Sequence, residues 1–289
     1  MKRKIMFFLL STIFWSGVSI PIFDRAMLQR SFPNDSPLVI AHRGASGHAP
    51  ENTMAAIRLA LDMKSDVIEI DVHLSKDKQV IVIHDATLDR TTTGSGSVDT
   101  YSLAELKELD AGSWMGDKFV GESIPTLEEV IEVVGEQSIL LIEIKKGKKK
   151  RYEGLEQKVI DLVRKYRTEN HTIIQSFQKK TIEKVIRLAP EIEAHKLIIG
   201  KLPIVSWHHD GKWQFYHPLK IEGVKAINPA FQFLTKSFVR NMRMADKKIF
   251  VYTVNTTEKM EKCMEMGVSG IITNYPDRLV ELIGKRQNQ

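Results

Sequence analysis

Cysteine is nearly absent from this sequence, since Cys263 is the one thiol in 289 residues. A single thiol cannot close an internal disulfide, and it cannot supply the several thiolates of a structural zinc site. Neither the fold nor any metal chemistry can therefore rest on sulfur. A glycine-rich loop is also missing after the first strand-like stretch, residues 38–41, which disfavours a dinucleotide-binding fold.

A strong excess of charge of one sign is missing as well. The chain has 42 Lys and Arg residues against 36 Asp and Glu residues, which gives a net charge of +6 at pH 7 and a pI near 9.2. Proteins that bind nucleic acids concentrate basic residues far more heavily, so we predict no nucleic-acid partner. No pattern indicates a protein partner. Hydrophobic residues make up 43% of the chain, enough for one large core or two modest ones.

Charge is also missing from residues 5–23, an apolar run that follows the three basic residues 2–4. This is the layout of a signal peptide or an N-terminal membrane anchor, and we predict one of the two for residues 1–23. The run approaches the roughly 20 apolar residues that cross a bilayer, so both remain open. Basic residues before the run favour a cell-membrane protein with the rest of the chain outside, or a secreted one. Residues 24–36, with their prolines and polar residues, are predicted to form a linker.

From residue 37 onward, strand-like and helix-like patterns alternate. Strands are predicted near residues 38–41, 67–74, 139–145, 172–177, 194–200, 225–230, 249–255 and 270–274. Helices are predicted near residues 52–63, 126–134 and 155–166, up to residue 188, from residue 235, around Cys263 and from residue 276. Eight such units in roughly 250 residues predict an α/β fold, a (β/α)8 TIM barrel over residues 37–289. A doubly wound open sheet is the alternative.

Residues 67–85, VIEIDVHLSKDKQVIVIHD, contain two strands with a very short connection. Residues 75–79 are too few for a crossover helix, so residues 67–74 and 80–84 must form an antiparallel hairpin. The second arm is then an addition to the second barrel strand. The loop-rich stretch at about residues 86–123 is predicted to be a small insertion after this hairpin.

Acidic residues gather near the ends of two predicted barrel strands, and the C-terminal ends of barrel strands form the functional face of this fold. Glu69 and Asp71 are two residues apart on one strand and share a face, and Glu143 lies on the next barrel strand. Crowded carboxylates repel one another unless positive charge lies among them. A hard divalent cation such as Mg²⁺ or Ca²⁺ suits this all-oxygen set, and salt bridges to Lys or Arg are the alternative.

Two histidines also occupy strand ends. His42 follows the first strand and His84 closes the hairpin, and each is followed by a charged residue. A hydrogen-bonded core histidine is the simpler explanation of either one alone. Two together at the ends of neighbouring strands indicate acid and base chemistry near neutral pH.

A set of motifs carries a family resemblance. It comprises IAHRGASGHAPENTMAAIRLAL, VIEIDVHLSKDKQVIVIHDATLDRTTTGSG, LDAGSW, IPTLEEV, LLIEIK, VYTVN and GVSGIITNYPD. In this order, from about residue 38 to 284, the chain resembles the glycerophosphodiester phosphodiesterase family. The resemblance implies a (β/α)8 barrel with a small insertion after the hairpin. It also implies a metal-dependent hydrolase that cleaves small-molecule glycerophosphodiesters to sn-glycerol 3-phosphate and an alcohol.

The resemblance also assigns roles to single residues. It implies that His42 and His84 act as general acid and base. The other implied roles are divalent-metal ligation by Glu69, Asp71 and Glu143, and phosphate binding by Arg43 and Lys145. Tyr252 stands where the family commonly has a tryptophan that lines the glycerol pocket. Asn274 stands where an acid is frequent, and Asn52, in the PENT turn, is predicted to be a helix N-cap.

Two further stretches bear on the substrate. The basic loop 145–151, KKGKKKR, and the aromatic segment 201–222 could contact a membrane surface, although a solvated loop and a small separate core explain them as well. They leave open a lysophospholipase D-like lipid phosphodiesterase as the alternative function. A non-catalytic binding barrel is disfavoured because neither histidine and none of the three acids is missing.

Overall fold

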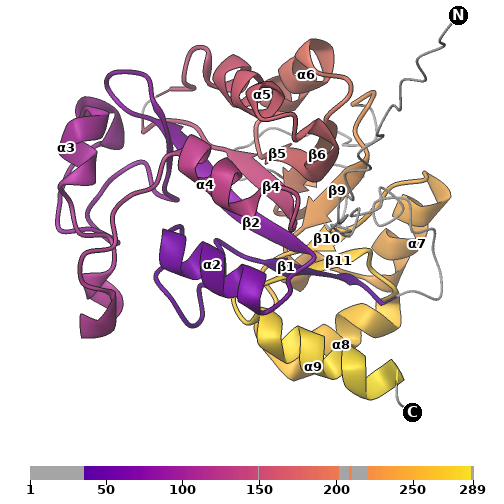
Figure 1. Cartoon of the computed structure of the whole chain (residues 1–289). Helices are drawn as coiled ribbons and strands as arrows, with labels where there is room; N and C mark the ends of the chain where they lie inside the picture. The colour runs from indigo at the N-terminus through magenta and orange to yellow at the C-terminus, as the bar shows by residue number, and fades with distance from the viewer. Residues whose placement is uncertain (1–35, 149, 202–207, 210–220, 288–289) are drawn as a thin grey trace, which may run out of the picture.

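Eight parallel strands form the centre of the computed structural model, which describes residues 36–148, 150–201, 208–209 and 221–287 (Figure 1). Neighbouring strands pair in the order β10-β11-β1-β2-β4-β5-β6-β9. These strands are β1 (Leu38–Ala41), β2 (Val67–Leu74), β4 (Ile139–Ile144), β5 (Thr172–Ser176), β6 (Glu193–Ile198), β9 (Ala226–Pro229), β10 (Phe250–Val251) and β11 (Gly270–Thr273).

The two ends of this strand order meet, so the sheet is a closed barrel. Parallel bridges join Ala226 to Lys248 and Ala230 to Tyr252. The main-chain N–H of Ile227 donates to the carbonyl of Lys248 at 3.0 Å across the same junction. Closure excludes the doubly wound open sheet and confirms the predicted TIM barrel.

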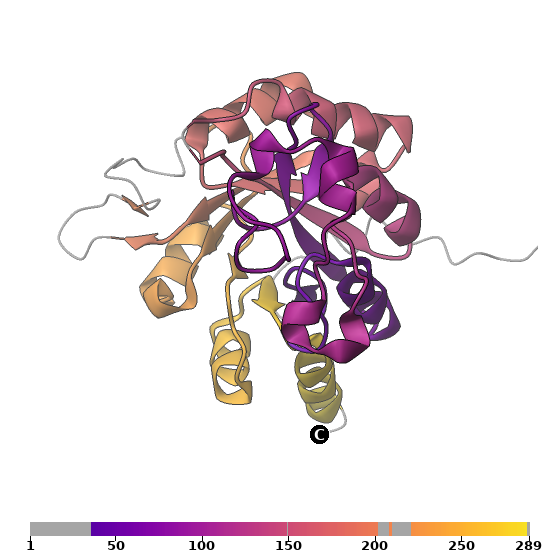
Figure 2. The ribbon, with the colours of Figure 1, turned by 90° about the vertical axis from the view of Figure 1, so that its left-hand side faces the viewer.

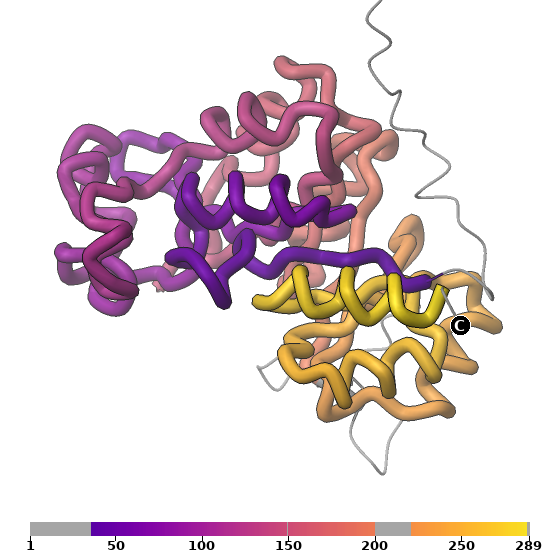
Figure 3. Tube along the Cα trace, turned by 60° about the horizontal axis from the view of Figure 1, so that its bottom comes forward, coloured from indigo at the N-terminus to yellow at the C-terminus, as the bar shows by residue number. Residues whose placement is uncertain are grey.

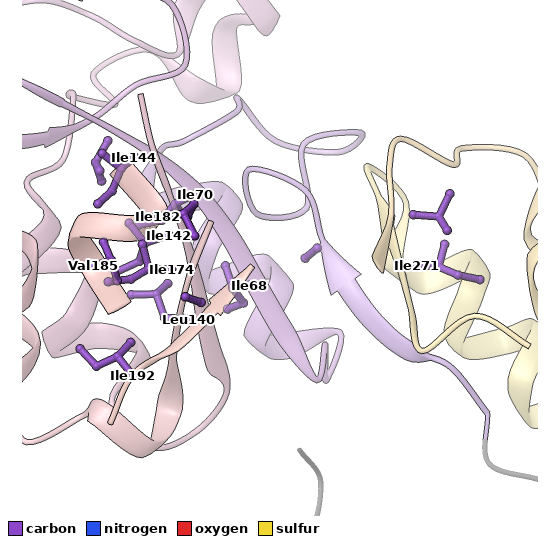
Figure 4. Packing of buried hydrophobic residues seen from close by; sticks show 14 of the residues in the cluster. Ile68, Ile70, Leu140, Ile142, Ile144, Ile174, Ile182, Val185, Ile192 and Ile271 are labelled. Carbon is purple, nitrogen blue, oxygen red and sulfur yellow. The ribbon is translucent and has the colours of Figure 1, made fainter. Parts of the chain in front are cut away.

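Helices surround the barrel on its outside (Figure 2). They are α2 (Met54–Asp62), α4 (Leu127–Val134), α5 (Leu155–Lys165), α6 (Lys179–Leu188), α7 (Lys236–Met244), α8 (Thr257–Met266) and α9 (Pro276–Gln287). Each turns a stripe of buried residues toward the strands. In Figure 4, Ile182 and Val185 of α6 lie against Ile142 of β4 and Ile174 of β5, all of them fully buried. This layer between the helices and the sheet is the largest of the three hydrophobic clusters in the described part of the chain.

The predicted hairpin is present. Strand β3 (Val80–Val82) pairs antiparallel with β2, and Val72 lies opposite Val82. The segment after it contains η1 (Val98–Thr100), α3 (Leu103–Lys107), η2 (Ser113–Met115) and η3 (Asp117–Phe119), and it projects to one side of the barrel in Figure 1. Leu88, Val98 and Leu106 form a separate small core there. The remaining elements of the described residues are η4 (Glu169–His171), η6 (Phe231–Phe233) and the two-stranded pair β7 (Gly200–Lys201) and β8 (His208–His209).

Side chains inside the barrel change from apolar to acidic along β2 and β4. The interior on the N-terminal side of the acids is apolar and contains Leu38, Ile40, Val67, Ile139, Leu141, Ile173, Phe250 and Ile272. Because side chains alternate along a strand, Glu69 and Asp71 follow Val67 on the same face, and Glu143 follows Leu141. The acids thus lie above the apolar layer, toward the C-terminal ends of the strands.

The barrel has a seam where segments distant in sequence meet. Strand β1 pairs with β11 along its whole length, from Leu38 opposite Gly270 to Ala41 opposite Thr273. Helix α9 lies beside β1, as the tube in Figure 3 shows. The first and last barrel strands are therefore direct neighbours.

Two predictions lie outside the described residues. They are the signal peptide or anchor at residues 1–23 with its linker, and most of the aromatic segment 201–222. Within the part of the chain that the structure describes, every helix is too short or too polar to cross a membrane.

Candidate active site

A tight turn after β1 positions the first candidate residues. Arg43 has φ +54° and Gly44 has φ +76°, both in the left-handed region. A Cβ on Gly44 would lie 2.6 Å from the carbonyl carbon of Ala56, so only glycine lets α2 approach this closely. The turn directs the main-chain N–H of Arg43 to Oε2 of Glu69 at 2.9 Å.

Three buried carboxylates converge beside this turn. Glu69, Asp71 and Glu143 each place an oxygen within 4.8 Å of the others. Nζ of Lys145 lies 3.1 Å from Oδ1 of Asp71 and 2.8 Å from Oε1 of Glu143. Nε of Arg43 lies 3.4 Å from Oδ2 of Asp71. The structure therefore brings together the predicted acids and both predicted phosphate-binding cations.

Their charges are unevenly compensated. Burial, together with Asp71 and Glu143, raises the pKa of Glu69 well above its ordinary value. Burial also raises the pKa of Glu143, although Lys145 opposes the shift. Burial acts against the ionised form of Asp71 too, but Lys145 and Arg43 outweigh it and hold that pKa below its ordinary value. Three acids share two cations, so the cluster lacks positive charge.

This deficit fits a divalent cation. The donors are all oxygens, they are buried, and they already lie within the span of one coordination sphere. Glu69 receives a main-chain N–H and an amide N–H, and within the described residues no lysine or arginine side chain forms an ion pair with it. Salt bridges, the alternative considered from sequence, are present at Asp71 and Glu143 but leave Glu69 without one.

His42 is half-buried and hydrogen-bonded to an amide. Its Nδ1 lies 2.7 Å from Oδ1 of Asn274, which follows β11. An amide oxygen accepts, so Nδ1 carries the proton and Nε2 the lone pair. Burial and the charge of Arg43 lower the pKa of His42 to about 3. At neutral pH this histidine is therefore a neutral proton acceptor.

His84 is bound to a carboxylate and is more exposed. It lies just beyond β3, which ends at Val82, and Nδ1 lies 2.6 Å from Oδ1 of Asp85. Burial lowers the pKa of His84, whereas Asp71 and Asp85 both favour its charged form. The carboxylate partner makes the imidazolium form easier to reach than in His42.

Arg90 links several of these groups, and the sequence interpretation missed it. Its Nε donates to Asp85 at 2.7 Å, and its two terminal nitrogens donate to Glu51 at 2.7 and 2.8 Å. Glu51 also accepts from Nη1 of Arg43 at 2.7 Å. Arg90 lies in the quoted stretch VIEIDVHLSKDKQVIVIHDATLDRTTTGSG, only five residues after Asp85, which was the available signal.

The predicted N-cap role of Asn52 is wrong. Thr53 caps α2, and its side chain accepts from the N–H of Ala56. Asn52 has φ +57° and instead donates from Nδ2 to Oδ2 of Asp71 at 2.9 Å, while its Oδ1 accepts from the Asp71 N–H at 3.2 Å. Adjacent Asn and Thr can both cap a helix, but asparagine adopts left-handed backbone more readily, which frees it for Asp71.

A pocket of about 310 Å³ opens at this end of the barrel. Its lining includes His84, Glu143 and Lys145 together with apolar groups such as the ring of Phe177. Tyr252 is not among the residues that line the pocket. Its ring packs edge-on against the ring of Phe177, with the two ring centroids 6.0 Å apart, and its hydroxyl donates to the carbonyl of Ile198 at 2.8 Å. Among the described residues, Phe177 is the phenyl ring that lines this pocket, and sequence reasoning did not single it out.

His73 is hydrogen-bonded to the main chain of His84. Its Nε2 lies 3.0 Å from the main-chain carbonyl of His84, so Nε2 donates and Nδ1 accepts from the hydroxyl of Tyr152 at 2.9 Å. Burial lowers the pKa of His73 to about 4. It is a neutral neighbour of the site.

Sequence comparison places this geometry among known proteins. The model described as "Glycerophosphoryl diester phosphodiesterase family" matches residues 42–278. A protein of Caldanaerobacter subterraneus named glycerophosphodiester phosphodiesterase is 40% identical over 249 residues, 86% of this chain and 98% of its own length. A Bacillus subtilis protein of the same name is 37% identical, covering 84% of this chain and 85% of its own.

Solved structures agree. A phosphodiesterase from Oleispira antarctica in complex with the product sn-glycerol-3-phosphate matches with a TM-score of 0.74 and 32% identity, over 86% of this chain and 97% of its own. A glycerophosphodiester phosphodiesterase from Agrobacterium tumefaciens matches with a TM-score of 0.70 and 30% identity, over 85% of this chain and 99% of its own.

Proposed function

Because the chain belongs to the glycerophosphodiester phosphodiesterase family, we propose that it hydrolyses glycerophosphodiesters to sn-glycerol 3-phosphate and an alcohol. One observation carries the proposal: two histidines with different partners lie at the same end of the barrel as three clustered, buried carboxylates, and His84 and Glu143 line a pocket there. The sn-glycerol-3-phosphate bound to the Oleispira antarctica relative supports the product.

Charge neutralisation is the first requirement of this reaction, because the anionic oxygens of a phosphodiester repel a nucleophile. Arg43 and Lys145 would bind those oxygens, and their charges are held at the site by Asp71. Glu69, Asp71 and Glu143 would hold a divalent cation, Mg²⁺ or Ca²⁺. Such a cation, when bound, supplies further electrostatic stabilisation of the developing charge.

Proton transfer is the second requirement. Nε2 of His42 takes the proton of the attacking hydroxyl, either water or the substrate's own glycerol 2-hydroxyl, as the new O–P bond forms. Attack by the glycerol 2-hydroxyl gives a cyclic phosphate, which a water molecule then hydrolyses to glycerol 3-phosphate. Protonated His84 gives its Nε2 proton to the leaving alcohol oxygen as the old P–O bond breaks. The assignment rests on the low pKa of His42 and on the carboxylate that favours protonated His84.

The direct test is an assay of the purified full-length chain with glycerophosphocholine and Mg²⁺ or Ca²⁺. We expect release of glycerol 3-phosphate, its loss on chelation, and a fall of 10²- to 10⁴-fold in His84→Ala. His48→Ala is a matched control, since His48 pairs with Asp277 outside the proposed machinery. A folded protein that releases no glycerol 3-phosphate with any divalent ion would falsify the proposal.

One observation favours a second candidate activity, on lysophospholipids. Phe177, Ile144 and Ile199 give the pocket an apolar wall that could contact an acyl chain. Lysophosphatidylcholine tested in parallel separates the two: faster release of choline from it than from glycerophosphocholine would favour the lipid phosphodiesterase.

We also propose that the chain acts outside the cell, anchored or secreted. The proposal is supported by the apolar run at residues 5–23 after three basic residues. Cell fractionation tests it: the chain should appear with membranes or in the medium, and deletion of residues 2–23 should retain it inside. Intact chain found free inside cells would contradict it.

A further inference from the structure

A chain of buried hydrogen bonds leads from the carboxylate cluster into the barrel. Nε2 of Gln175 donates to Oε1 of Glu69 at 3.2 Å, and Nδ2 of Asn228 donates to Oε1 of Gln175 at 3.0 Å. Nδ1 of His195 lies 3.4 Å from the same Nδ2. All four side chains are at most 2% exposed, and they come from strands β2, β5, β9 and β6.

The direction of this chain is fixed by the backbone. The main-chain N–H of Phe250 donates to Oδ1 of Asn228 at 3.3 Å, so that atom is the amide oxygen and the other is the NH₂ group. That NH₂ group faces Gln175, which must therefore turn its oxygen to Asn228 and its own NH₂ group to Glu69. Each amide orientation follows from the preceding one.

At the far end of this series of hydrogen bonds, His195 is held in one tautomer. Its Nε2 lies 2.7 Å from Oε1 of Glu193, and Nζ of Lys248 lies 2.9 and 3.1 Å from the two oxygens of that carboxylate. A carboxylate accepts, so Nε2 carries the proton and Nδ1 accepts from Asn228. This ion pair lies toward the opposite end of the barrel, because Glu193 begins β6.

We propose that Asn228 and His195 are positioning residues that keep Gln175 as a hydrogen-bond donor to Glu69, and that they thereby set the divalent-cation affinity of the site. Glu69 is thus fixed through Oε2 by Arg43 and through Oε1 by Gln175. A buried donor left without its acceptor is costly, so the orientation of Gln175 is strongly held. The inference rests on the proposed function in that Glu69 is taken as a ligand.

Asn228→Asp tests the direction of the hydrogen bonds between His195 and Glu69. The new carboxylate cannot donate, so Gln175 must turn its NH₂ group toward it and present its oxygen to Glu69. We expect the Kd for Mn²⁺, measured by calorimetry on the full-length chain, to rise 10- to 100-fold. Thr172→Val is the matched control, since Thr172 is buried on β5 and its hydroxyl has no hydrogen bond within the described residues. The Kd of this variant for Mn²⁺ should stay within twofold of the Kd of the unsubstituted protein.

His195 gives a second, more distant pair of variants that does not depend on the folding of the first. His195→Gln keeps one acceptor and one donor and should preserve the Kd, whereas His195→Leu removes both and should weaken Mn²⁺ binding by about tenfold. A purely structural network would lower thermal stability in His195→Leu without changing the Kd.

The outcomes separate this inference from the proposed function. Folded Asn228→Asp or His195→Leu protein with an unchanged Kd overturns the inference alone. An original chain that binds no Mn²⁺ overturns both the inference and the proposed cation site.

Discussion

At the scale of single residues, the partner of each histidine sets its chemistry. His42 meets the neutral oxygen of Asn274, and His84 meets the carboxylate of Asp85. Both rings are forced toward the same tautomer, with the proton on Nδ1, but only His84 has a charged acceptor. The two histidines are therefore chemically different before any substrate arrives.

Asn274→Asp should move the acidic limb of the pH profile upward. A carboxylate next to Nδ1 stabilises the charged imidazolium, which raises the pKa of His42 from its value of about 3. Since neutral His42 is the proposed base, activity should then be lost at a higher pH as the solution is acidified. We expect the acidic limb of kcat/KM to shift up by about 1 to 3 pH units. An active variant whose acidic limb stays in place would show that His42 is not the base.

Arg90 is the residue that joins the segment after the hairpin to the site, and Arg90→Met tests that link. Its hydrogen bonds to Asp85 and Glu51 are lost, so His84 and Arg43 lose part of their support. We expect kcat/KM to fall by about tenfold, while Tm changes little because exposed ion pairs contribute about 0 to 1 kcal/mol. Lys107→Met removes a comparable pair with Glu129, away from the site, and should leave kcat/KM unchanged.

At the scale of elements, the turn between β1 and α2 is constrained both by its left-handed backbone and by close packing at Gly44. Gly44→Ala should destabilise the protein by about 2 to 4 kcal/mol, because it adds strain at φ +76° to a contact with the backbone of Ala56. Gly96→Ala is a matched control with φ +90° and nothing within 4 Å of the added carbon. Urea unfolding should show about 1 kcal/mol for the control, and equal losses for both would refute the packing argument.

Much of the element order could be predicted from the sequence because period-two alternation and short connections are local signals. The hairpin followed from the few residues between its arms, and the three acids from their spacing on β2 and β4. The link between Gln175 and Asn228 could not be predicted, because it depends on the relative register of β5, β6 and β9. The N-cap of α2 was missed because Asn52 is recruited by Asp71, a tertiary contact with no local signal.

At the scale of the whole molecule, a divalent cation at the proposed site would couple ligand binding to the stability of the fold. Mg²⁺ or Ca²⁺ at about 100 times its Kd should stabilise the folded chain by about 2.7 kcal/mol, which raises Tm by roughly 5 to 10 °C. Calorimetry with and without chelator measures this. Because the pKa of Glu69 is raised, protons compete for the site and the increase should shrink as the pH falls.

A Glu69→Gln, Asp71→Asn double variant is the control for this prediction. It removes two of the three proposed ligands, so its Tm should be nearly independent of the divalent ion. A large cation-dependent increase in this variant would place the binding site elsewhere.

The seam between β1 and β11 has a consequence for biosynthesis. His42 lies at the start of the barrel and its partner Asn274 near the end, and β11 completes the sheet between β10 and β1. A nascent chain therefore has neither a closed barrel nor an oriented His42 until residue 274 has left the ribosome. If the chain is exported unfolded, the reaction is confined to the destination compartment by the order in which the polypeptide is made.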